Sequence, residues 1–177
     1  MIKGSLLAVP IGDVSQDLML WLKSALTDTL NCDVSLRDSI SLPSEWYNSA
    51  RGQYCGVDFL RALEHIPRKD YGPILGVADV NCYACGLNFV FGLADPYTGV
   101  ALVALPRLRQ SFYGLAEDEE LFRQRALKEA VHELGHTLGL GHCTDTLCVM
   151  HFSNMLNDTD RKSANYCELC KRKIGVK

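Results

Sequence analysis

The sequence lacks the features by which membrane and secreted proteins are recognised. No apolar run in its 177 residues reaches the roughly 20 residues that a membrane-spanning helix needs. The apolar run at residues 1–10 ends at Pro10 and contains one basic residue, Lys3, so it is too short for a secretory signal. Internal repeats and low-complexity segments are absent as well. We therefore expect a soluble, cytoplasmic protein that does not bind membranes.

The chain also has little net charge of either sign. Its formal net charge is −3, and its composition is 22% charged and 47% hydrophobic. These proportions are ordinary for a globular protein, and the length allows one domain with a sizeable core. Because the balance is slightly acidic, we do not expect nucleic acid as a main partner.

Hydrophobic periodicity predicts an α+β fold with a mixed, twisted sheet and two or three helices. Apolar or alternating runs bounded by turn residues predict strands at 5–9, 32–40, 73–80, 87–91 and 100–105. Apolar residues at helical spacing predict helices after residue 13, over 57–65, from residue 117 onward and, as a short helix, around 163–173. We expect a loop at 43–52.

The most specific motif lies at residues 132–142, where the spacing is H-E-x-x-H-x-x-G-x-x-H. His132 and His136 are four residues apart, so they project from one face of a helix and can share a zinc ion. Glu133 is next in sequence and can reach a water molecule bound to that ion. The motif therefore predicts an active-site helix with a metal near its end.

The extension of the motif beyond the helix strengthens this interpretation. A bare H-E-x-x-H occurs by chance in helices that bind nothing, but Gly139 and His142 fix two further positions. Gly139 lets the chain leave the helix in a conformation that a side chain would resist, and the turn can return His142 as third ligand. Three protein ligands leave a fourth position open for water, which is typical of a catalytic zinc site.

The cysteines predict a second metal site. In a chain without a secretory signal, eight cysteines favour metal binding over disulfides. Cys143-x4-Cys148 and Cys167-x2-Cys170 have the spacing of a closed, structural four-thiolate zinc site. The tail has too few large apolar residues for its own core, and a zinc site can contribute on the order of 10 kcal/mol to folding. Reduced buried cysteines or two disulfides are the alternatives.

Two assignments among these residues need a choice. His142 and Cys143 are adjacent, yet we assign them to different ions, because a thiolate on the first zinc would weaken its Lewis acidity. The pair Cys82 and Cys85 has no partner pair, so it is a disulfide, a redox pair or packed thiols, of which we favour packed thiols. Two further cysteines are isolated, Cys32 and Cys55.

The two motifs divide the chain near residues 139–142. We expect residues 1–141 to form an N-terminal α/β subdomain that includes the active-site helix. Residues 142–177 would form a small C-terminal subdomain held by the four-cysteine zinc. Together they would make one catalytic domain, with the catalytic metal in the cleft between them.

Taken together, H-E-x-x-H-x-x-G-x-x-H-C-x4-C-x-M and the later C-x-x-C resemble the archaemetzincins, a family of the metzincin clan of zinc peptidases. The match is close over 132–170, and residues 86–92 and the apolar run before Arg107 are also similar. The resemblance implies a metzincin-like fold and two zinc ions, one on the three histidines and one on the four cysteines. It also implies that Glu133 is the general base.

The same resemblance gives a role to Met150, which matches the methionine of the metzincin Met-turn. That side chain would form an apolar floor beneath the catalytic ligands. Some metzincins have a tyrosine two residues later, where this chain has Phe152. Because phenylalanine has no hydroxyl, another group would have to take that role, either His151 or a residue upstream.

These residues predict zinc-assisted hydrolysis of a peptide bond in a peptide or protein substrate. Zinc would lower the pKa of a bound water toward ~7, and Glu133 would accept its proton and pass it to the leaving amine. We expect the strand at 100–105 to form the rim of the cleft and to bind an extended substrate by strand addition.

Two other functions are weighed against this one. A zinc-dependent binding module with idle machinery would have no use for Glu133. A nucleic-acid-binding zinc ribbon would use the basic residues of the tail, but the rest of the chain is net acidic and only Tyr166 is interleaved with them. A solvated charged surface accounts for these residues, which are Arg161, Lys162, Lys171, Arg172, Lys173 and Lys177.

Overall fold

The structure is a computed structural model that describes residues 5–68 and 71–175. The beginning of the expected N-terminal apolar run, including Lys3, and the tail residue Lys177 lie outside the described residues. Within the two described ranges, no helix has both the length and the apolar character that crossing a membrane requires.

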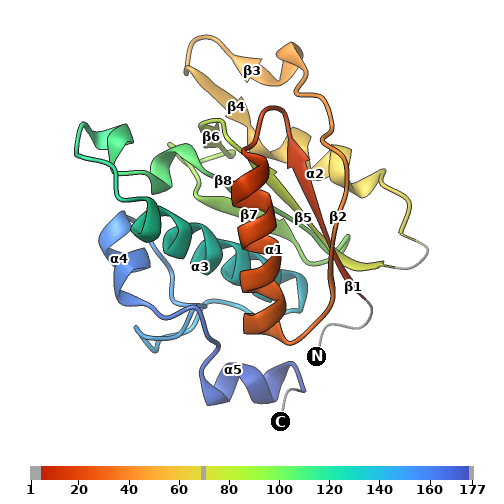
Figure 1. The fold of residues 1–177 in the computed structure, drawn as a ribbon, viewed down its shortest axis with the longest axis vertical. Helices are drawn as coiled ribbons and strands as arrows, with labels where there is room; N and C mark the ends of the chain where they lie inside the picture. The colour runs from red at the N-terminus through yellow and green to blue at the C-terminus, as the bar shows by residue number, and fades with distance from the viewer. Residues whose placement is uncertain (1–4, 69–70, 176–177) are drawn as a thin grey trace.

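A five-stranded sheet with the order β2-β1-β5-β8-β7 forms the centre of the fold (Figure 1). Its strands are β1 (Ser5–Ile11), β2 (Val34–Leu36), β5 (Tyr71–Ala78), β7 (Gly92–Asp95) and β8 (Val100–Ala104). The pairs β1–β2, β1–β5 and β5–β8 are parallel, whereas β7 pairs antiparallel with β8. The predicted mixed sheet is therefore confirmed, and β7 is one of its two edge strands.

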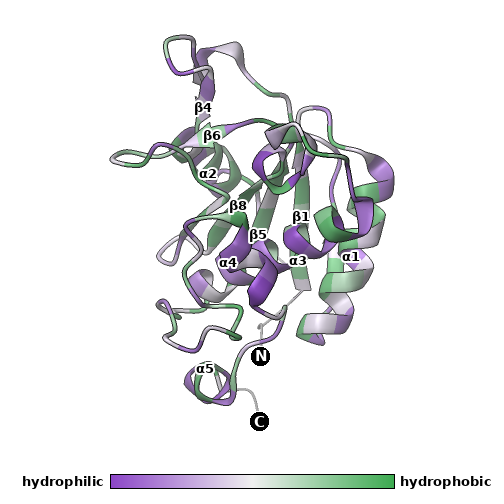
Figure 2. Ribbon diagram, turned by 90° about the vertical axis from the view of Figure 1, so that its left-hand side faces the viewer, coloured by the Kyte–Doolittle hydropathy of each residue, from purple (hydrophilic) through white to green (hydrophobic). Residues whose placement is uncertain are grey.

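Helices cover both faces of this sheet because successive strand residues point to opposite sides. Leu6 and Ala8 of β1 belong to one core cluster, together with buried residues of α1 (Gln16–Leu30) and α3 (Glu119–Thr137). Leu7 and Val9 belong to the other, which includes residues of α2 (Gly56–Glu64). Strands β5 and β8 are green in Figure 2, as expected for parallel strands that are covered on both faces.

One predicted strand was wrong. Residues 87–91 are irregular apart from a single bridge between Val90 and Cys82. The strand is β7 instead, in a stretch where the sequence predicted none. The reason is the tight turn after β7. The Asp95 carboxylate accepts hydrogen bonds from the Tyr97 N–H and the Thr98 hydroxyl, and Gly99 has a φ of +65°, so β7 and β8 form a hairpin.

The other predicted elements differ mainly in their ends. The strand expected at 32–40 is only β2, and the loop expected at 43–52 contains a 3₁₀ turn (Ser44–Trp46) and β3 (Tyr47–Asn48). Strand β3 joins β4 (Gln53–Cys55) and β6 (Cys82–Tyr83) in a small second sheet. Two further 3₁₀ turns lie between β8 and α3, at Pro106–Leu108 and Ser111–Tyr113.

The tail contains two short helices, of which the sequence predicted one. The final helix is α5 (Glu168–Lys173), shorter than expected. Helix α4 (Leu156–Arg161) was missed because its six residues are mostly polar and show no helical periodicity. It is stabilised at its start by Asp158, whose carboxylate accepts hydrogen bonds from the N–H groups of Asn154 and Met155.

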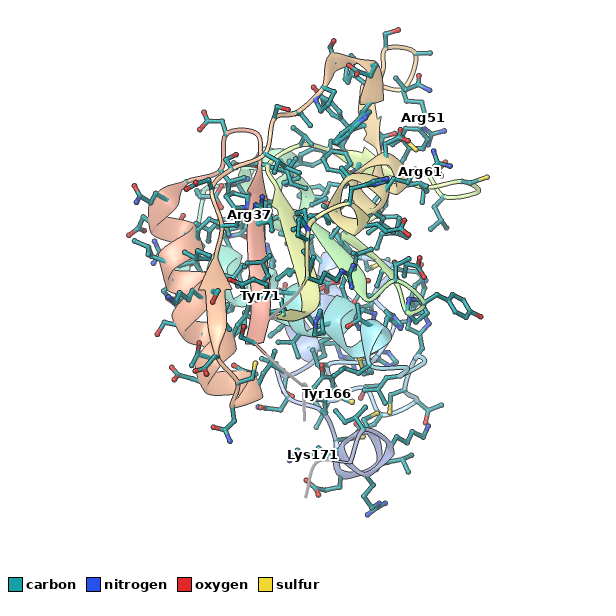
Figure 3. The ribbon with its side chains drawn as sticks, turned by 90° about the vertical axis from the view of Figure 1, so that its right-hand side faces the viewer. Arg37, Arg51, Arg61, Tyr71, Tyr166 and Lys171 are labelled. Atoms are coloured by element: carbon teal, nitrogen blue, oxygen red, sulfur yellow. The ribbon has the colours of Figure 1, made fainter. Side chains whose placement is uncertain are left out.

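The tail packs on α3 and completes the main core. Val149 and Met150 are fully buried in the same cluster as the sheet and α3. Tyr166 lies between the main body of the fold and α5 (Figure 3), and its hydroxyl donates a hydrogen bond of 2.9 Å to the carbonyl of Val131. The tail therefore depends on α3 for its burial.

A buried ion pair joins α3 to the residue after α4. Lys162, which we expected on a solvated surface, is fully buried instead, and its Nζ lies 2.9 Å from Oε1 of Glu129. The contact is an ion pair without hydrogen-bond geometry, and Thr159 donates the directed hydrogen bond of 2.9 Å to the same oxygen. Nearby, Arg125 binds both carboxylate oxygens of Asp160 at 2.7 Å.

We expect Lys162→Met to lower the free energy of unfolding by about 3–5 kcal/mol, because it leaves the Glu129 carboxylate buried without a counter-ion. Urea denaturation followed by circular dichroism measures this. The double variant Glu129→Gln/Lys162→Met should recover most of the loss, since both charges are gone. Lys173→Met, at an exposed position, is the control, and an equal effect of the two lysine variants would contradict a structural role for the pair.

Candidate active site

Three histidines come together where α3 ends. His132 and His136 lie one turn apart on α3, His142 follows the helix, and their ligand atoms lie within 4.8 Å of one another. The Nε2 atoms of His132 and His136 are 3.1 Å apart. Gly139 has a φ of +85°, the left-handed conformation expected for it, and this turn directs the chain back so that His142 faces the other two.

The surroundings of these imidazoles fit a bound cation. Nδ1 of His132 lies 2.7 Å from the Val149 carbonyl, and Nδ1 of His136 lies 2.8 Å from the Leu140 carbonyl. A carbonyl oxygen accepts, so each Nδ1 donates there, and in the neutral ring each Nε2 then has a lone pair and no proton. Two such lone pairs 3.1 Å apart repel each other unless a cation lies between them. The donor set therefore suits zinc.

Burial favours the neutral form of His132 and of His142, which is the form that binds metal. It lowers the pKa of His132 to about 3, and the nearby Lys162 ammonium adds to the effect. The pKa of His142 is lowered too, first by burial and then by His136.

Glu133 lines the same cavity as the three histidines, and its side chain is almost fully buried. Burial raises its pKa well above the usual value, and the neighbouring Glu129 raises it further. Its position depends on Gly92 at the start of β7, because a Cβ on Gly92 would lie 2.5 Å from Cγ and 2.6 Å from Oε1 of Glu133. Sequence reasoning missed Gly92, since only the long-range packing of β7 on α3 reveals it.

A cavity of about 730 Å³ lies above the histidines. One part of its lining is residues 86–94, which include the first three residues of β7, and another is Phe152, Ser153 and Asn154. We expected the strand at 100–105 to form the rim, which was wrong. Strand β8 lies between β5 and β7 and is buried throughout, whereas β7 has a free edge.

The residues around Met150 form the floor beneath α3. Met150 is fully buried, and a Cβ on Gly135 would lie 2.3 Å from its sulfur. Phe152 lines the cavity with its ring 4.8 Å from that of His142. His151 is not among the cavity-lining residues, and its Nδ1 lies 3.1 Å from the Cys143 carbonyl. These contacts give no support to His151 as the substitute for a tyrosine.

The four tail cysteines gather separately. The sulfur atoms of Cys143, Cys148, Cys167 and Cys170 lie within 4.8 Å of one another, and the pairs Cys143–Cys167 and Cys148–Cys170 are both at 3.8 Å. A disulfide needs about 2.05 Å, so the alternative of two disulfides does not hold in this structure. The structure thus separates the adjacent residues His142 and Cys143 into different clusters.

The electrostatics of the four thiols also suit a cation. The backbone N–H of Cys170 lowers the pKa of Cys167 to about 7, whereas burial raises the pKa of Cys148 and Cys170. A divalent ion deprotonates thiols that coordinate it, so it would convert this mixed set into four thiolates.

The remaining cysteines take no part in either cluster. Cys82 is buried, as expected for a packed thiol, but Cys85 is exposed, and the two are not joined by a disulfide. Cys32 and Cys55 are partly buried.

Comparisons with known proteins give a consistent picture. A family model described as peptidase family M54 matches residues 33–176. The archaemetzincin of Pyrococcus furiosus is 45% identical over 176 residues, which cover 96% of this chain and 91% of that protein. The archaemetzincin of Methanocaldococcus jannaschii is 41% identical, with coverage of 93% and 89%.

Solved structures show the same relationship. The crystal structure of an archaemetzincin from Archaeoglobus fulgidus, complexed with malonate, has a TM-score of 0.83 at 37% identity and covers 96% of this chain and 99% of that one. A zinc-dependent peptidase from Methanocorpusculum labreanum has a TM-score of 0.86 at 30% identity, with coverage of 96% and 99%.

We expect Gly135→Ala to lower the free energy of unfolding by about 1–3 kcal/mol, because the new methyl group overlaps the Met150 sulfur. Urea denaturation measures this, and Met150→Ala in the same chain should relieve the overlap, so that the two effects are not additive. Gly141→Ala is the control, since a Cβ there meets no atom within 4 Å. If Gly135→Ala is no more destabilising than Gly141→Ala, the close contact of α3 with Met150 is wrong.

Proposed function

Because this chain belongs to peptidase family M54, the archaemetzincins, and is a zinc metallopeptidase, we propose that it cleaves peptide bonds in the cavity at the end of α3. His132, His136 and His142 would hold the zinc ion, and Glu133 is the general base. The observation that carries this proposal is the 3.1 Å approach of two Nε2 atoms, on rings whose Nδ1 atoms face carbonyl oxygens, beside a buried carboxylate in one cavity.

A zinc ion held there would lower the pKa of a coordinated water toward ~7 and polarise the substrate carbonyl. Glu133 accepts the proton of the attacking water and transfers it to the leaving amine. In the described part of the chain, no group donates a hydrogen bond to its carboxylate, so both oxygens are free to take the proton. Its burial makes the carboxylate a stronger base than an exposed glutamate.

The substrate is a peptide or protein, and we propose that it binds along β7. This strand pairs with β8 on one side only, so the backbone groups of its other edge can pair with an extended peptide. Gly92 at the start of β7 touches Glu133, and β7 lines the cavity. A chain bound to this edge would therefore pass next to the general base.

We propose further that Cys143, Cys148, Cys167 and Cys170 hold a second, structural zinc ion. This ion would fix the start of the tail, and with it His142, next to Cys143 in sequence. Residues 1–141 and 142–177 then form two subdomains of one catalytic domain. The cavity between them draws residues from both, in support of this division.

We expect Glu133→Gln to reduce kcat/KM by at least about 100-fold with no change in zinc content, because it removes the proton acceptor and no ligand.

Gly92→Ala should reduce kcat by roughly 10- to 100-fold, because its methyl group displaces the Glu133 carboxylate. Both are measured on a quenched fluorescent peptide library. Lys173→Met, at an exposed position outside the cavity, is the control, and wild-type rates in Glu133→Gln would exclude Glu133 as base.

We expect metal analysis of the purified protein to give two zinc equivalents. Replacing the three histidines by alanine, or the four cysteines by serine, should lower the content to about one in each case. Two equivalents in either multiple variant would contradict the assignment of its ligands. If wild type contains one equivalent, titration with zinc chloride must restore the second, and failure to do so would rule out the two-ion proposal.

A further inference from the structure

A second cavity adjoins the one above the histidines. Its volume is about 400 Å³, and it shares Phe89, Phe91 and Asn154 with the larger cavity. The two spaces are therefore neighbours along one continuous surface. Much of the second cavity is apolar, and Arg107 is the only charged residue among those that line it within the described part of the chain.

Three contacts hold the Arg107 guanidinium in place. It lies 4.3 Å from the ring centroid of Phe89 and 4.7 Å from that of Phe112, and its Nε donates a hydrogen bond of 2.7 Å to Oδ1 of Asn81. Stacking on aromatic faces and one directed hydrogen bond fix both the plane and the direction of the group. Its orientation is therefore set before any ligand arrives.

Arg107 nevertheless has no counter-ion among the described residues. Arg109, two positions later, binds both carboxylate oxygens of Asp79 at 2.6 and 2.8 Å, but no described carboxylate pairs with Arg107. Asn81 occupies Nε, so the two η nitrogens are left without a described partner. Those two nitrogens form the fork that binds a carboxylate through two parallel hydrogen bonds.

The rest of the cavity suits an apolar stem. Phe89 and Phe91 line one part of it and Met155 and Leu156 another, and the Met155 side chain is 59% exposed. A group that fills this space and also reaches Arg107 must be apolar along its length and negatively charged at its end. A bare anion would leave the apolar walls exposed to water, and a purely apolar group would leave the guanidinium unpaired.

We propose that this second cavity is a specificity pocket for a substrate carboxylate on an apolar stem, with Arg107 as its counter-ion. The inference rests on the proposed function, since a substrate that lies over the histidines reaches the pocket through the shared residues. A glutamate side chain and the C-terminal carboxylate of a peptide offer the same chemistry. Arg107 then determines which peptides bind and takes no part in the cleavage step.

The test uses matched peptides that are acetylated and amidated at their ends and differ at one position, scanned along the chain, with Glu, Gln, Leu or Lys there. The leucine peptide is also made with a free C-terminus. Binding to the zinc-loaded Glu133→Gln variant is measured by fluorescence anisotropy, and cleavage by the wild type is followed by mass spectrometry. We expect one position at which Glu exceeds Gln by at least about tenfold in affinity.

Two substitutions separate charge recognition from structural damage. Arg107→Gln should abolish the tenfold preference, and Arg107→Glu should reverse it in favour of Lys, which loss of packing alone cannot do. Arg161→Glu makes the same change of charge at an exposed position of α4 and should keep the glutamate preference. Circular dichroism verifies that each variant is folded.

The possible outcomes test the proposed pocket and the proposed hydrolytic function separately. A glutamate preference that depends on Arg107 supports the pocket, and a preference of the same kind for the free C-terminus supports it with the main-chain carboxylate as ligand. Equal affinity of all peptides, or a preference that survives Arg107→Gln, overturns it. Arg107-dependent binding without cleavage of any peptide leaves the pocket standing and counts against the hydrolytic function. Cleavage without any preference for a carboxylate overturns the pocket and supports the hydrolytic function.

Discussion

The close packing of α3 against the segment 148–166 is the contact on which the rest of the site depends. The Val149 carbonyl fixes the ring of His132, Met150 fills the space left by Gly135, and the Tyr166 hydroxyl binds the Val131 carbonyl. None of these contacts is available to an isolated helix. The tail therefore sets the orientation of the His132 ring on α3, and the tail is buried because α3 covers it.

The two proposed metal sites are mechanically linked through the same contact. Cys143 follows His142 directly, its N–H donates a hydrogen bond of 2.9 Å to the Met150 carbonyl, and Met150 lies under Gly135. A shift of the four-cysteine cluster would therefore move both the third histidine and the floor beneath the other two. Such a link explains how a short tail with few apolar residues can hold His142 in position.

The sequence predicted the parts of the site whose spacing is local. His132, His136 and Gly139 follow from helix geometry and the turn that ends the helix, and the strands β1, β5 and β8 follow from their apolar runs. It did not predict residues that act across the fold. Gly92 matters only because β7 lies against Glu133, and the burial of Lys162 depends on Glu129, which is 33 positions earlier in the chain. Neither partner can be found by periodicity, which reports on neighbours within one element.

Two carboxylates, Glu129 and Glu133, lie one turn apart on α3 and line the same cavity, and their surroundings distinguish the proposed base from its neighbour. Glu129 accepts a hydrogen bond from Thr159 and pairs with Lys162, so its charge is already balanced. Glu133 has neither partner in the described part of the chain. Burial raises the pKa of Glu133, and the Lys162 ammonium, which forms its ion pair with Glu129, offsets only part of that rise. We therefore give Glu129 a structural role, as the partner of Lys162, and keep Glu133 as the proposed general base.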